Sequence, residues 1–307
     1  MTCEPMRHNP TVSLVIPTCG RDSALERCLY SVARLLDPPD EVIVIENGSD
    51  AGEARALAGR HAFRFVYERR SGASRARNMG ALKSSGDVIA FLDDDEVVDP
   101  HWMQSIRGAF TDESVDVMTG LVLPLVLETS AQIRFERRFS FNRGYEGRRF
   151  EGSVDAAWKL GGSGNMAVRL STFVSLGGFD ERLGAGAAGC SEDTNFFERV
   201  LEAGGVCVYK PEAVVFHEHR SDDAALRRQL HTYMRGCTVA HLLAAFERRR
   251  PASLLRFLRT APAWYAKTFL RLLLGTSPIS LRELLSEMGG CFAGVVWYLR
   301  LSSRHNP

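Results

Sequence analysis

The chain has 307 residues, of which 45% are hydrophobic, so it can bury the core of one large domain or of one domain with an appendage. Its 38 Lys and Arg residues nearly balance 37 Asp and Glu residues, which argues against a nucleic-acid binder. The seven cysteines are odd in number and form no Cys-x-x-Cys pair, which fits reduced thiols in a cytoplasmic protein and gives no indication of a zinc site.

No segment has the composition of a signal peptide or a spanning helix. Residues 1–10 are polar, and no uncharged apolar run reaches the roughly 18 residues that a spanning helix needs. We therefore expect a cytoplasmic protein, either free or peripheral at the inner face of the membrane.

The first 120 residues alternate strand and helix patterns. Strands are predicted at 11–17, 41–45 and 63–67, and helices at 23–36, 51–61 and 74–84. This order is typical of βαβ units around a parallel sheet. A Gly-x-Gly-x-x-Gly turn is missing after the first strand, and no Gly-x-x-x-x-Gly-Lys loop occurs, which disfavours dinucleotide dehydrogenases and P-loop enzymes.

The most informative segment is Val88–Asp95, an apolar strand followed directly by three aspartates. The strand shows no polar alternation, which predicts burial on both faces of a parallel sheet, and such sheets bind ligands at the carboxyl ends of their strands. Neighbouring carboxylates raise one another's pKa, and a hard divalent cation is the usual compensation. The triplet therefore predicts a ligand or metal site. One alternative stays open: an acidic turn that caps a helix near Pro100–Trp102.

Residues 134–149 carry six arginines around aromatic residues. Such a segment is either a mobile lid over a phosphorylated ligand or a solvated loop, and we favour the loop because charge runs usually lie on the surface. By themselves, Gly161–Met166 and Gly177–Glu181 have the composition of ordinary turns.

Two further segments carry groups suited to chemistry. The acidic pair Glu192-Asp193 opens a helix that runs to about Ala203, where acids also serve simply to complement the helix dipole. A strand at 213–219 ends in His217 and His219, whose spacing places two imidazoles on one side, suited to a metal or a phosphate. Exposed strand-end histidines are an equal alternative.

The order of these segments resembles that of glycosyltransferase family 2, whose members have the GT-A nucleotide-sugar fold. The matching segments are Val15–Thr18 with Arg21, Glu46–Asp50, Gly72–Gly80, Asp93–Asp95, Gly164–Met166, Gly178–Glu181, Glu192-Asp193 and His217. They span about residues 11 to 220. Each is weak alone, but eight in the family's order make the resemblance specific.

The resemblance implies an α/β fold of GT-A type: a Rossmann-like, mixed and mostly parallel sheet flanked by helices, with a C-terminal helical appendage. It also implies an inverting enzyme that moves a sugar from a nucleoside-diphosphate sugar to an acceptor hydroxyl. Two departures stand out. Glu46 replaces the more common Asp, and the Gln-x-x-Arg-Trp motif of processive synthases is absent, which favours transfer of a single sugar.

The resemblance also assigns roles to residues. Asp193, in the pair Glu192-Asp193, is the implied catalytic base that takes the proton of the acceptor hydroxyl. Asp95, helped by His217, is implied to hold Mg²⁺ or Mn²⁺ against the diphosphate leaving group, and the choice between His217 and His219 stays open. The expected nucleotide-binding residues are Pro17, Thr18, Arg21, Glu46, Asn47, Arg75, Asn78, Asp93 and Asp94, with Asp93 facing the ribose.

A catalytic domain is predicted at 1–220 and a helical region at 221–307. From Arg227 onward there are thirteen Lys and Arg residues against three Glu, interleaved with apolar residues such as Leu258 and Phe269. This pattern predicts basic amphipathic helices, which suit an anionic membrane surface. An apolar face that covers the catalytic domain or forms a homodimer is at least as good an interpretation.

Two other functions stay open. A sugar-1-phosphate nucleotidyltransferase would share fold and metal, but its Gly-rich signature with Arg after the first strand is missing. A non-catalytic nucleotide-binding or membrane-surface scaffold is the second, although its expected damage to the base or metal site is not seen. The sequence leaves the donor open among UDP, dTDP and GDP types, and the acceptor among glycan, lipid-linked and small-molecule types.

Overall fold

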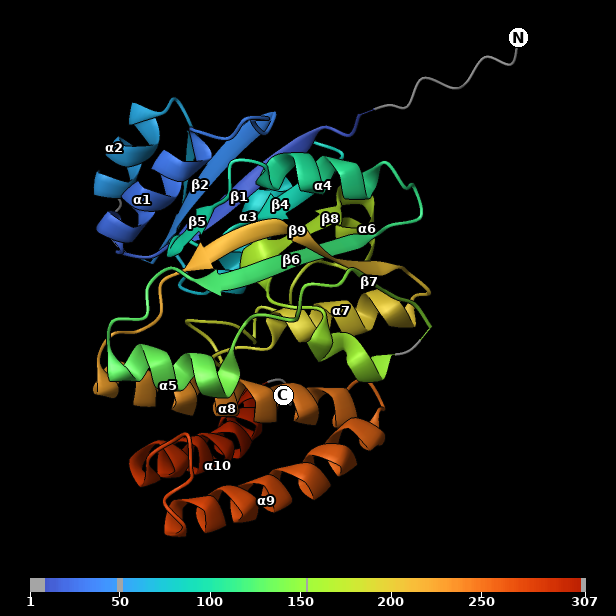
Figure 1. Cartoon of the computed structure of the whole chain (residues 1–307). Coiled ribbons are helices and arrows are strands. Elements are labelled where there is room, and N and C mark those ends of the chain that lie inside the picture. Colours follow the sequence, from blue (N-terminus) through green and yellow to red (C-terminus); the bar gives the residue numbers. More distant parts are fainter. Residues whose placement is uncertain (1–8, 49–51, 153, 305–307) are drawn as a thin grey trace. The chain divides into compact units, whose positions relative to one another are not determined.

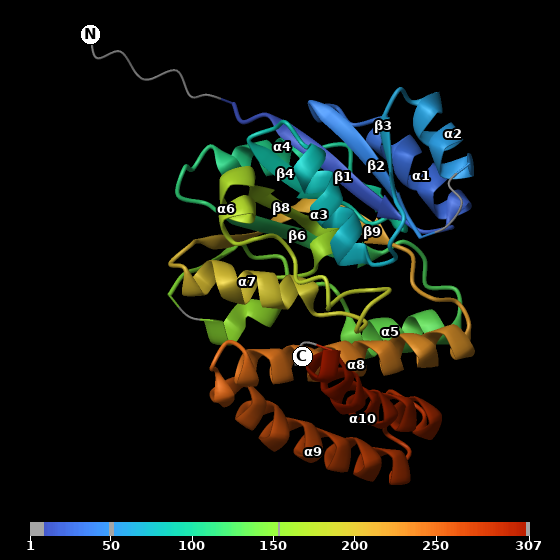
Figure 2. The same cartoon turned by 180° about the vertical axis from the view of Figure 1, so that it is seen from behind.

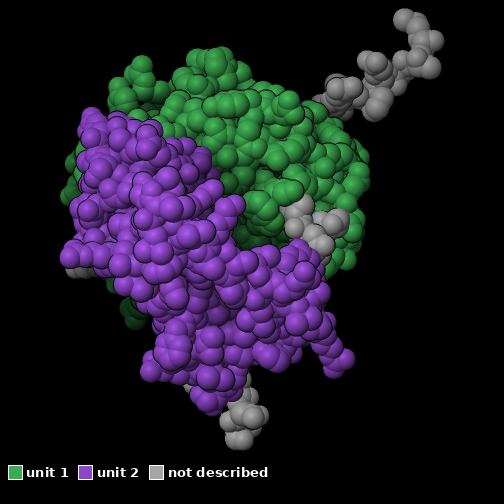
Figure 3. All heavy atoms as spheres, turned by 60° about the horizontal axis from the view of Figure 1, so that its bottom comes forward, with its two compact units in different colours: residues 1–125, 141–180, 193–218 green, residues 126–140, 181–192, 219–307 purple. Residues whose placement is uncertain are grey.

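The computed structural model describes residues 9–48, 52–152 and 154–304. The chain divides into two compact units, coloured in Figure 3. Unit 1 holds residues up to 125, 141–180 and 193–218, and unit 2 holds residues 126–140, 181–192 and 219 onward. The predicted division at residue 220, between a catalytic domain and a helical region, stays a prediction. Ser49 and Asp50, from the turn predicted after the second strand, lie outside the described residues.

Unit 1 is built on one sheet. Its described residues form nine strands in the order β3-β2-β1-β4-β8-β6-β9-β5, with β7 also paired to β9. The strands are β1 (Val12–Thr18), β2 (Glu41–Asn47), β3 (Arg64–Glu68), β4 (Val88–Phe91), β5 (Glu96–Val98), β6 (Val117–Pro124), β7 (Arg148–Phe150), β8 (Met166–Arg169) and β9 (Cys207–His217). β5, β7 and β8 run antiparallel to the other six.

Helices cover both faces of this sheet. They are α1 (Asp22–Val32), α2 (Gly52–Arg60), α3 (Ala73–Lys83), α4 (Trp102–Phe110), α6 (Leu170–Ser175) and α7 (Glu192–Glu202), with short 3-10 helices at Val154–Lys159 and Ser163–Asn165. α1, α2 and α4 pack on one face against Leu14 and Ile16, whereas α3, α6 and α7 pack on the other against Val15 (Figures 1 and 2). Successive residues of a strand point to opposite faces, and both faces of β1 are covered by helices. This explains why its run Leu14–Pro17 is apolar without a break.

The predicted mixed, mostly parallel α/β sheet is confirmed, as is the alternation of strands and helices in the first 120 residues. The capping alternative for the aspartate triplet is wrong. The strand β5 lies between Asp95 and α4, and α4 begins after His101, which makes no side-chain capping bond. The carboxylates are therefore not used to start a helix.

The strand predicted at 213–219 is β9, which begins earlier and ends at His217. His219 belongs to unit 2, where its Nε2 lies 2.9 Å from Oε2 of Glu136 and its ring packs edge-on against Phe135. The expected pair of imidazoles on one strand tip is therefore wrong, because the strand stops before the second histidine.

Unit 2 carries α5 (Ser130–Phe139), α8 (Asp223–Phe246), α9 (Pro251–Leu273) and α10 (Leu281–Arg304). The predicted helical C-terminal region is confirmed, but the arginine-rich loop predicted from residue 134 is wrong as far as Phe139, because α5 spans it. The missed signal is the capping box in which Thr129 and Gln132 bond each other's backbone. No helix in the described ranges is both long and apolar enough to cross a membrane.

One face of α10 packs closely on α8. An added Cβ at Gly290 would lie 2.2 Å from the backbone oxygen of His231, and one at Gly294 would lie 2.6 Å from Cβ of Thr238. Only glycine lets the two helices approach this closely. Glu283 and Glu287 lie on the same face of α10 as the two glycines. Residues 283, 287, 290 and 294 are four, three and four positions apart, which follows the helical repeat.

Both glutamates are buried and lie near arginines of α5. Glu283 Oε1 accepts a hydrogen bond from Arg134 Nε at 2.9 Å, whereas Glu287 Oε2 is 3.8 Å from the nearest guanidinium nitrogen of Arg138. Among the described residues, neither carboxylate oxygen of Glu287 has a hydrogen-bond donor. Burial raises the pKa of Glu287 to about 7, although Arg138 partly opposes the shift.

We expect Gly80→Ala to destabilise unit 1. Gly80 on α3 faces β1, where an added Cβ would lie 2.3 Å from Cγ1 of the fully buried Val15. Overpacking of this kind costs about 1–3 kcal/mol of unfolding free energy. The matched control is Gly59→Ala on α2, where an added Cβ meets nothing within 4 Å and alanine favours the helix. Denaturant unfolding of both variants measures the difference, and equal effects would contradict this packing.

Glu287→Gln should remove a pH dependence of stability. The folded pKa of about 7 lies above the ordinary value of 4.5, so the folded state holds a proton that the unfolded chain releases between these values. Wild-type stability should therefore fall as pH rises across that window. Over the same interval, the unfolding free energy of the variant should rise relative to that of wild type by up to about 3 kcal/mol.

Urea unfolding across the window measures this gain. Glu146→Gln, at an exposed position, is the control and should keep the wild-type slope. If the Glu287 variant kept the wild-type dependence of unfolding free energy on pH, the raised pKa of Glu287 would be contradicted.

Candidate active site

The predicted site residues of unit 1 gather at one edge of the sheet. Thr18 ends β1, Asn47 ends β2, Asp93 follows β4 and His217 ends β9. These strands run in the same direction, so their carboxyl ends meet at one edge, where open α/β sheets bind their ligands.

The pairing of β5 with β9 brings Asp95 and His217 together. Glu96 is the register partner of His217, and the Glu218 N–H donates to the Asp95 carbonyl at 2.9 Å. As a result, His217 Nε2 lies 3.7 Å from Oδ1 of Asp95. The ring of Phe141 meets the His217 ring edge-on at 5.0 Å and holds its orientation.

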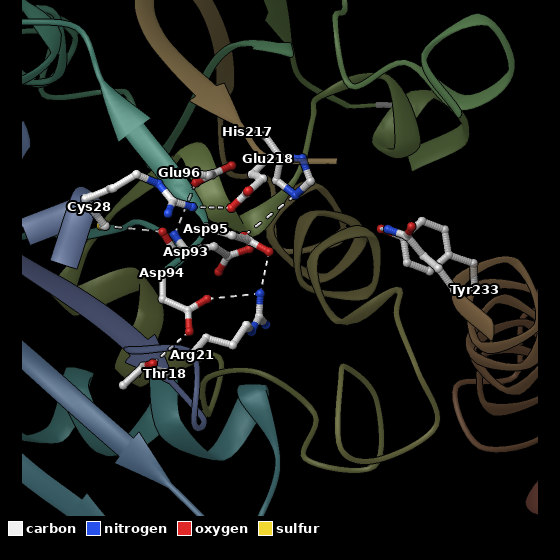
Figure 4. Close-up of polar contacts among 12 residues, drawn as sticks. Thr18, Arg21, Cys28, Asp93, Asp94, Asp95, Glu96, His217, Glu218 and Tyr233 are labelled. Atoms are coloured by element: carbon white, nitrogen blue, oxygen red, sulfur yellow. Dashed lines mark hydrogen bonds and ion pairs between the residues drawn. The ribbon is translucent and has the colours of Figure 1, made fainter. Parts of the chain in front are cut away.

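Arg21 lies between the carboxylates of Asp94 and Asp95 (Figure 4). Its guanidinium is 3.2 Å from Asp94 Oδ1 and forms a short ion pair with Asp95. The Thr18 hydroxyl donates to Asp94 Oδ2 at 2.7 Å. The loop after β1 therefore contacts the aspartate triplet directly.

A fourth carboxyl group, that of Glu96, lies beneath the triplet. It is fully buried and accepts a hydrogen bond from the Asp93 N–H at 3.1 Å. Gly164 packs against it: an added Cβ there would lie 2.7 Å from both Glu96 oxygens and 2.9 Å from Asp93 Oδ2. On the other side, the buried Arg77 of α3 pairs with Asp93 Oδ1 at 2.5 Å.

Fully ionised, these four carboxyl groups would hold more negative charge than the two arginines can balance. Burial raises the pKa of Asp94 to about 7, an effect that Asp95 reinforces and Arg21 opposes. Burial also raises the pKa of Glu96 well above its usual range, and Asp93 and Asp95 raise it further. A site with this imbalance favours an added cation.

Asp95 and His217 fit a divalent metal ion. A carboxylate oxygen and an imidazole nitrogen are both suitable ligands for Mg²⁺ or Mn²⁺, and here they lie 3.7 Å apart in a cation-favouring site. Within the described ranges, no three His, Cys, Asp or Glu side chains are placed to hold a metal by themselves. Mg²⁺ in proteins usually takes several of its ligands from substrate phosphates and water.

Asp193 lies near the start of α7 and is half-buried. Burial raises the pKa of its carboxyl, whereas a hydrogen bond from the Thr194 N–H, at 2.6 Å, and the charges of Arg77 and Arg143 lower it. Arg77 thus acts on Asp193 while pairing with Asp93, so its charge links the two parts of the site. Glu192, the other acid of the predicted pair, is buried. It is the first residue of α7 and belongs to unit 2, whereas the rest of α7 belongs to unit 1.

The two asparagines among the predicted nucleotide contacts hold local turns. The Asn47 amide donates to the carbonyls of Arg70 and Gly72 at 2.7 and 3.1 Å. Asn78 exchanges two hydrogen bonds of 2.9 Å with the backbone of Phe179. Glu46 and Pro17 are buried at the ends of β2 and β1, and Arg75 is half-buried on α3. Contact of these five residues with a nucleotide stays a prediction.

Sequence reasoning missed Arg77, Glu96 and Arg143. Arg77 had a readable signal, because it lies three residues after Ser74 and three before Gly80, on the small-residue face that turns toward the sheet. Glu96 follows the triplet directly and could have been included with it. The position of Arg143 beside Asp193 depends on the path of a long connection, for which the sequence has no local signal.

Two family models match the chain. Glycosyl transferase family 2 matches residues 13–155, and Glycosyl transferase family group 2 matches residues 88–301. The chain belongs to glycosyltransferase family 2. The resemblance drawn from the eight sequence motifs is thereby confirmed.

Curated relatives agree with this family, and a solved structure agrees with the fold. The pre-mycofactocin glycosyltransferase of Mycobacterium tuberculosis is 30% identical over 214 residues, which is 68% of this chain but only 43% of that protein. Glycosyltransferase AglE of Haloferax volcanii is 23% identical over 236 residues, or 72% of this chain and 71% of AglE. Among solved structures, mannosyltransferase PcManGT from Pyrobaculum calidifontis, in complex with GDP-Man and Mn²⁺, matches with a TM-score of 0.61, covering 96% of this chain and 89% of that one at 15% identity. The GT-A fold is thus confirmed.

Gly164→Ala should disturb the carboxylate cluster. The new methyl group would overlap the oxygens of Glu96 and Asp93, which are buried or tied to Arg77, so we expect a loss of about 1–3 kcal/mol in unfolding free energy. Gly162→Ala is the matched control two residues away, because its Cβ would meet Asp193 Oδ2 at an ordinary 3.6 Å and its φ of −121° suits any residue. Denaturant unfolding compares them, and an unchanged Gly164 variant would show that the carboxylates have room to move.

Proposed function

We propose that this chain is an inverting glycosyltransferase that moves one sugar from a nucleoside-diphosphate sugar to an acceptor hydroxyl. The observation that carries the proposal is the position of Arg77, which pairs with Asp93 in the carboxylate cluster and whose charge also lowers the pKa of Asp193. A half-buried carboxyl group and a cation-favouring site therefore lie within the influence of one guanidinium. Direct displacement needs both: a base for the acceptor and positive charge for the leaving diphosphate.

Asp193 acts as the base in this proposal. An acceptor hydroxyl is a poor nucleophile at neutral pH, so its proton must pass to a carboxylate as the oxygen attacks the anomeric carbon. Burial raises the pKa of Asp193 and so makes it a stronger base than an exposed aspartate, and the charges of Arg77 and Arg143 partly oppose that shift. The Thr194 N–H holds Oδ1, which fixes the carboxylate on the first turn of α7. A single base and one displacement give inversion at the anomeric carbon.

Asp95 and His217 would hold Mg²⁺ or Mn²⁺, which when bound supplies a Lewis acid for the diphosphate. Mn²⁺ is present with GDP-Man in the PcManGT structure, which supports a divalent ion and a nucleoside-diphosphate donor here. Thr18 and Arg21 contact Asp94 and Asp95, which supports a role for the β1 loop in contacting a phosphate or ribose beside them. Transfer of one sugar, rather than polymer synthesis, follows from the missing Gln-x-x-Arg-Trp motif.

A thermal-shift screen tests the proposed function first. Purified protein is melted with UDP, GDP, dTDP and their common sugar conjugates, each with and without Mn²⁺. A ligand that binds only the folded state raises the melting temperature, so one nucleotide should do so in a Mn²⁺-dependent way. No shift with any nucleotide would overturn the proposal.

Asp193→Asn should abolish transfer but keep nucleotide binding. The amide cannot accept the acceptor proton, so we expect activity to fall by about 10²-fold or more, since general-base help is worth 10²–10⁴-fold. The Mn²⁺-dependent thermal shift with the nucleotide should stay near that of wild type. Glu202 is an exposed acid at the other end of α7. Glu202→Gln is therefore the control and should keep both sugar transfer and nucleotide binding. Loss of nucleotide binding in the Asp193 variant would contradict its role as base.

A further inference from the structure

α10 is apolar on the face opposite the one that packs on α8. The inner face carries Glu283, Glu287, Gly290 and Gly294. The outer face carries a stripe of six large apolar side chains that are 42–74% exposed: Leu281, Leu285, Met288, Phe292, Val295 and Leu299. Their spacing of four and three residues places them in one line along the helix. A helix at a water-facing surface normally carries polar residues there.

α9 has an apolar stripe of the same kind. Its exposed members are Leu255, Leu258, Phe269, Leu270 and Leu273, which are 48–70% exposed. Basic residues lie beside this stripe, namely Arg256, Arg259, Lys267 and Arg271, and all four are exposed. α9 contains no acidic residue at all. We call the exposed stripes of α9 and α10, with these cations and with Arg282 and Arg300 of α10, the C-terminal face.

The charge on this face has one sign. From Arg248 to Arg304 the sequence has ten Lys and Arg residues and only two acids, Glu283 and Glu287. Both acids are buried beside arginines of α5, so they contribute nothing to the surface. The net charge of the whole chain, +1, hides this segregation. Any partner of the C-terminal face must therefore accept large apolar side chains and supply negative charge.

We propose that the C-terminal face docks on an anionic membrane surface. Apolar side chains enter the boundary of the acyl region, while arginines and lysines beside them meet anionic headgroups. A second copy of this chain fits less well, because two such faces would bring like charges together without any acid to pair them. The face would hold the proposed transferase beside a membrane-borne acceptor, and only this last step depends on the proposed function.

Vesicle binding tests the proposal. The full chain is mixed with phosphatidylcholine vesicles, with and without phosphatidylglycerol, and the bound fraction is measured by flotation. We expect binding that requires phosphatidylglycerol and weakens as salt is raised, because exposed charges are screened. Absence of binding to anionic vesicles at low salt would overturn it.

Two double variants separate the contributions. Arg259→Gln with Lys267→Gln should weaken binding to anionic vesicles by about thirtyfold, since each of the two cations contributes about 1 kcal/mol near the surface. Phe269→Ser with Phe292→Ser should weaken it at least as much, by removing apolar contacts. The controls lie in unit 1, at exposed positions: Lys210→Gln and Leu82→Ser should bind as wild type does.

Other occupants give different results. A dimer through this face would make the Phe269 and Phe292 variant smaller in sedimentation without affecting vesicle binding. If the face covers another part of the chain, the same variant should melt earlier and wild type should not bind vesicles. Either result overturns the membrane proposal. The nucleotide thermal shift, measured on the same proteins, reports the proposed function separately, so failure of one is not read as failure of the other.

Discussion

Repulsion among four buried or nearly buried carboxyl groups is the constraint around which the site of unit 1 is built. Asp93, Asp94, Asp95 and Glu96 follow one another in the chain, with Arg21 paired to Asp94 and Asp95 and Arg77 paired to Asp93. Folding such a cluster costs stability, which is tolerated at functional sites because a ligand recovers it. The close packing of Gly164 and the pairing of β5 with β9 keep the carboxyl groups together against this repulsion.

The parts of the fold with a strong local period could be predicted from the sequence. The unbroken apolar runs of β1, β2 and β4 predicted a buried parallel sheet, and the order of motifs predicted the family. Prediction failed where long-range pairing decides the outcome. β9 ends at His217, opposite the residues where β5 begins (Glu96) and β6 ends (Pro124), so His219 leaves the strand, and nothing in the local sequence marks that point. α5 was missed although its capping box was readable.

Burial explains why the site residues could be predicted only in part. The aspartate triplet and the acid before Thr194 are visible as sequence patterns, but their partners come from distant segments. Arg77 matters because α3 presents it beneath the sheet edge, and Arg143 because a long connection returns it to α7. In sequence, Arg143 looks like a surface charge, whereas small residues on both sides of Arg77 mark the face that turns toward the sheet. Both arginines lower the pKa of Asp193, and Arg77 also pairs with Asp93.

The shortness of β5 has a consequence for how the site responds to an ion. β5 is only three residues long, and its ladder with β9 is what sets Asp95 beside His217. Local opening of so short a strand would separate the two side chains at once. An ion held by both would therefore slow amide hydrogen exchange in β5 and at the Glu218 N–H, because opening would require its release. Binding of the ion and ordering of this edge of the sheet would therefore stabilise each other.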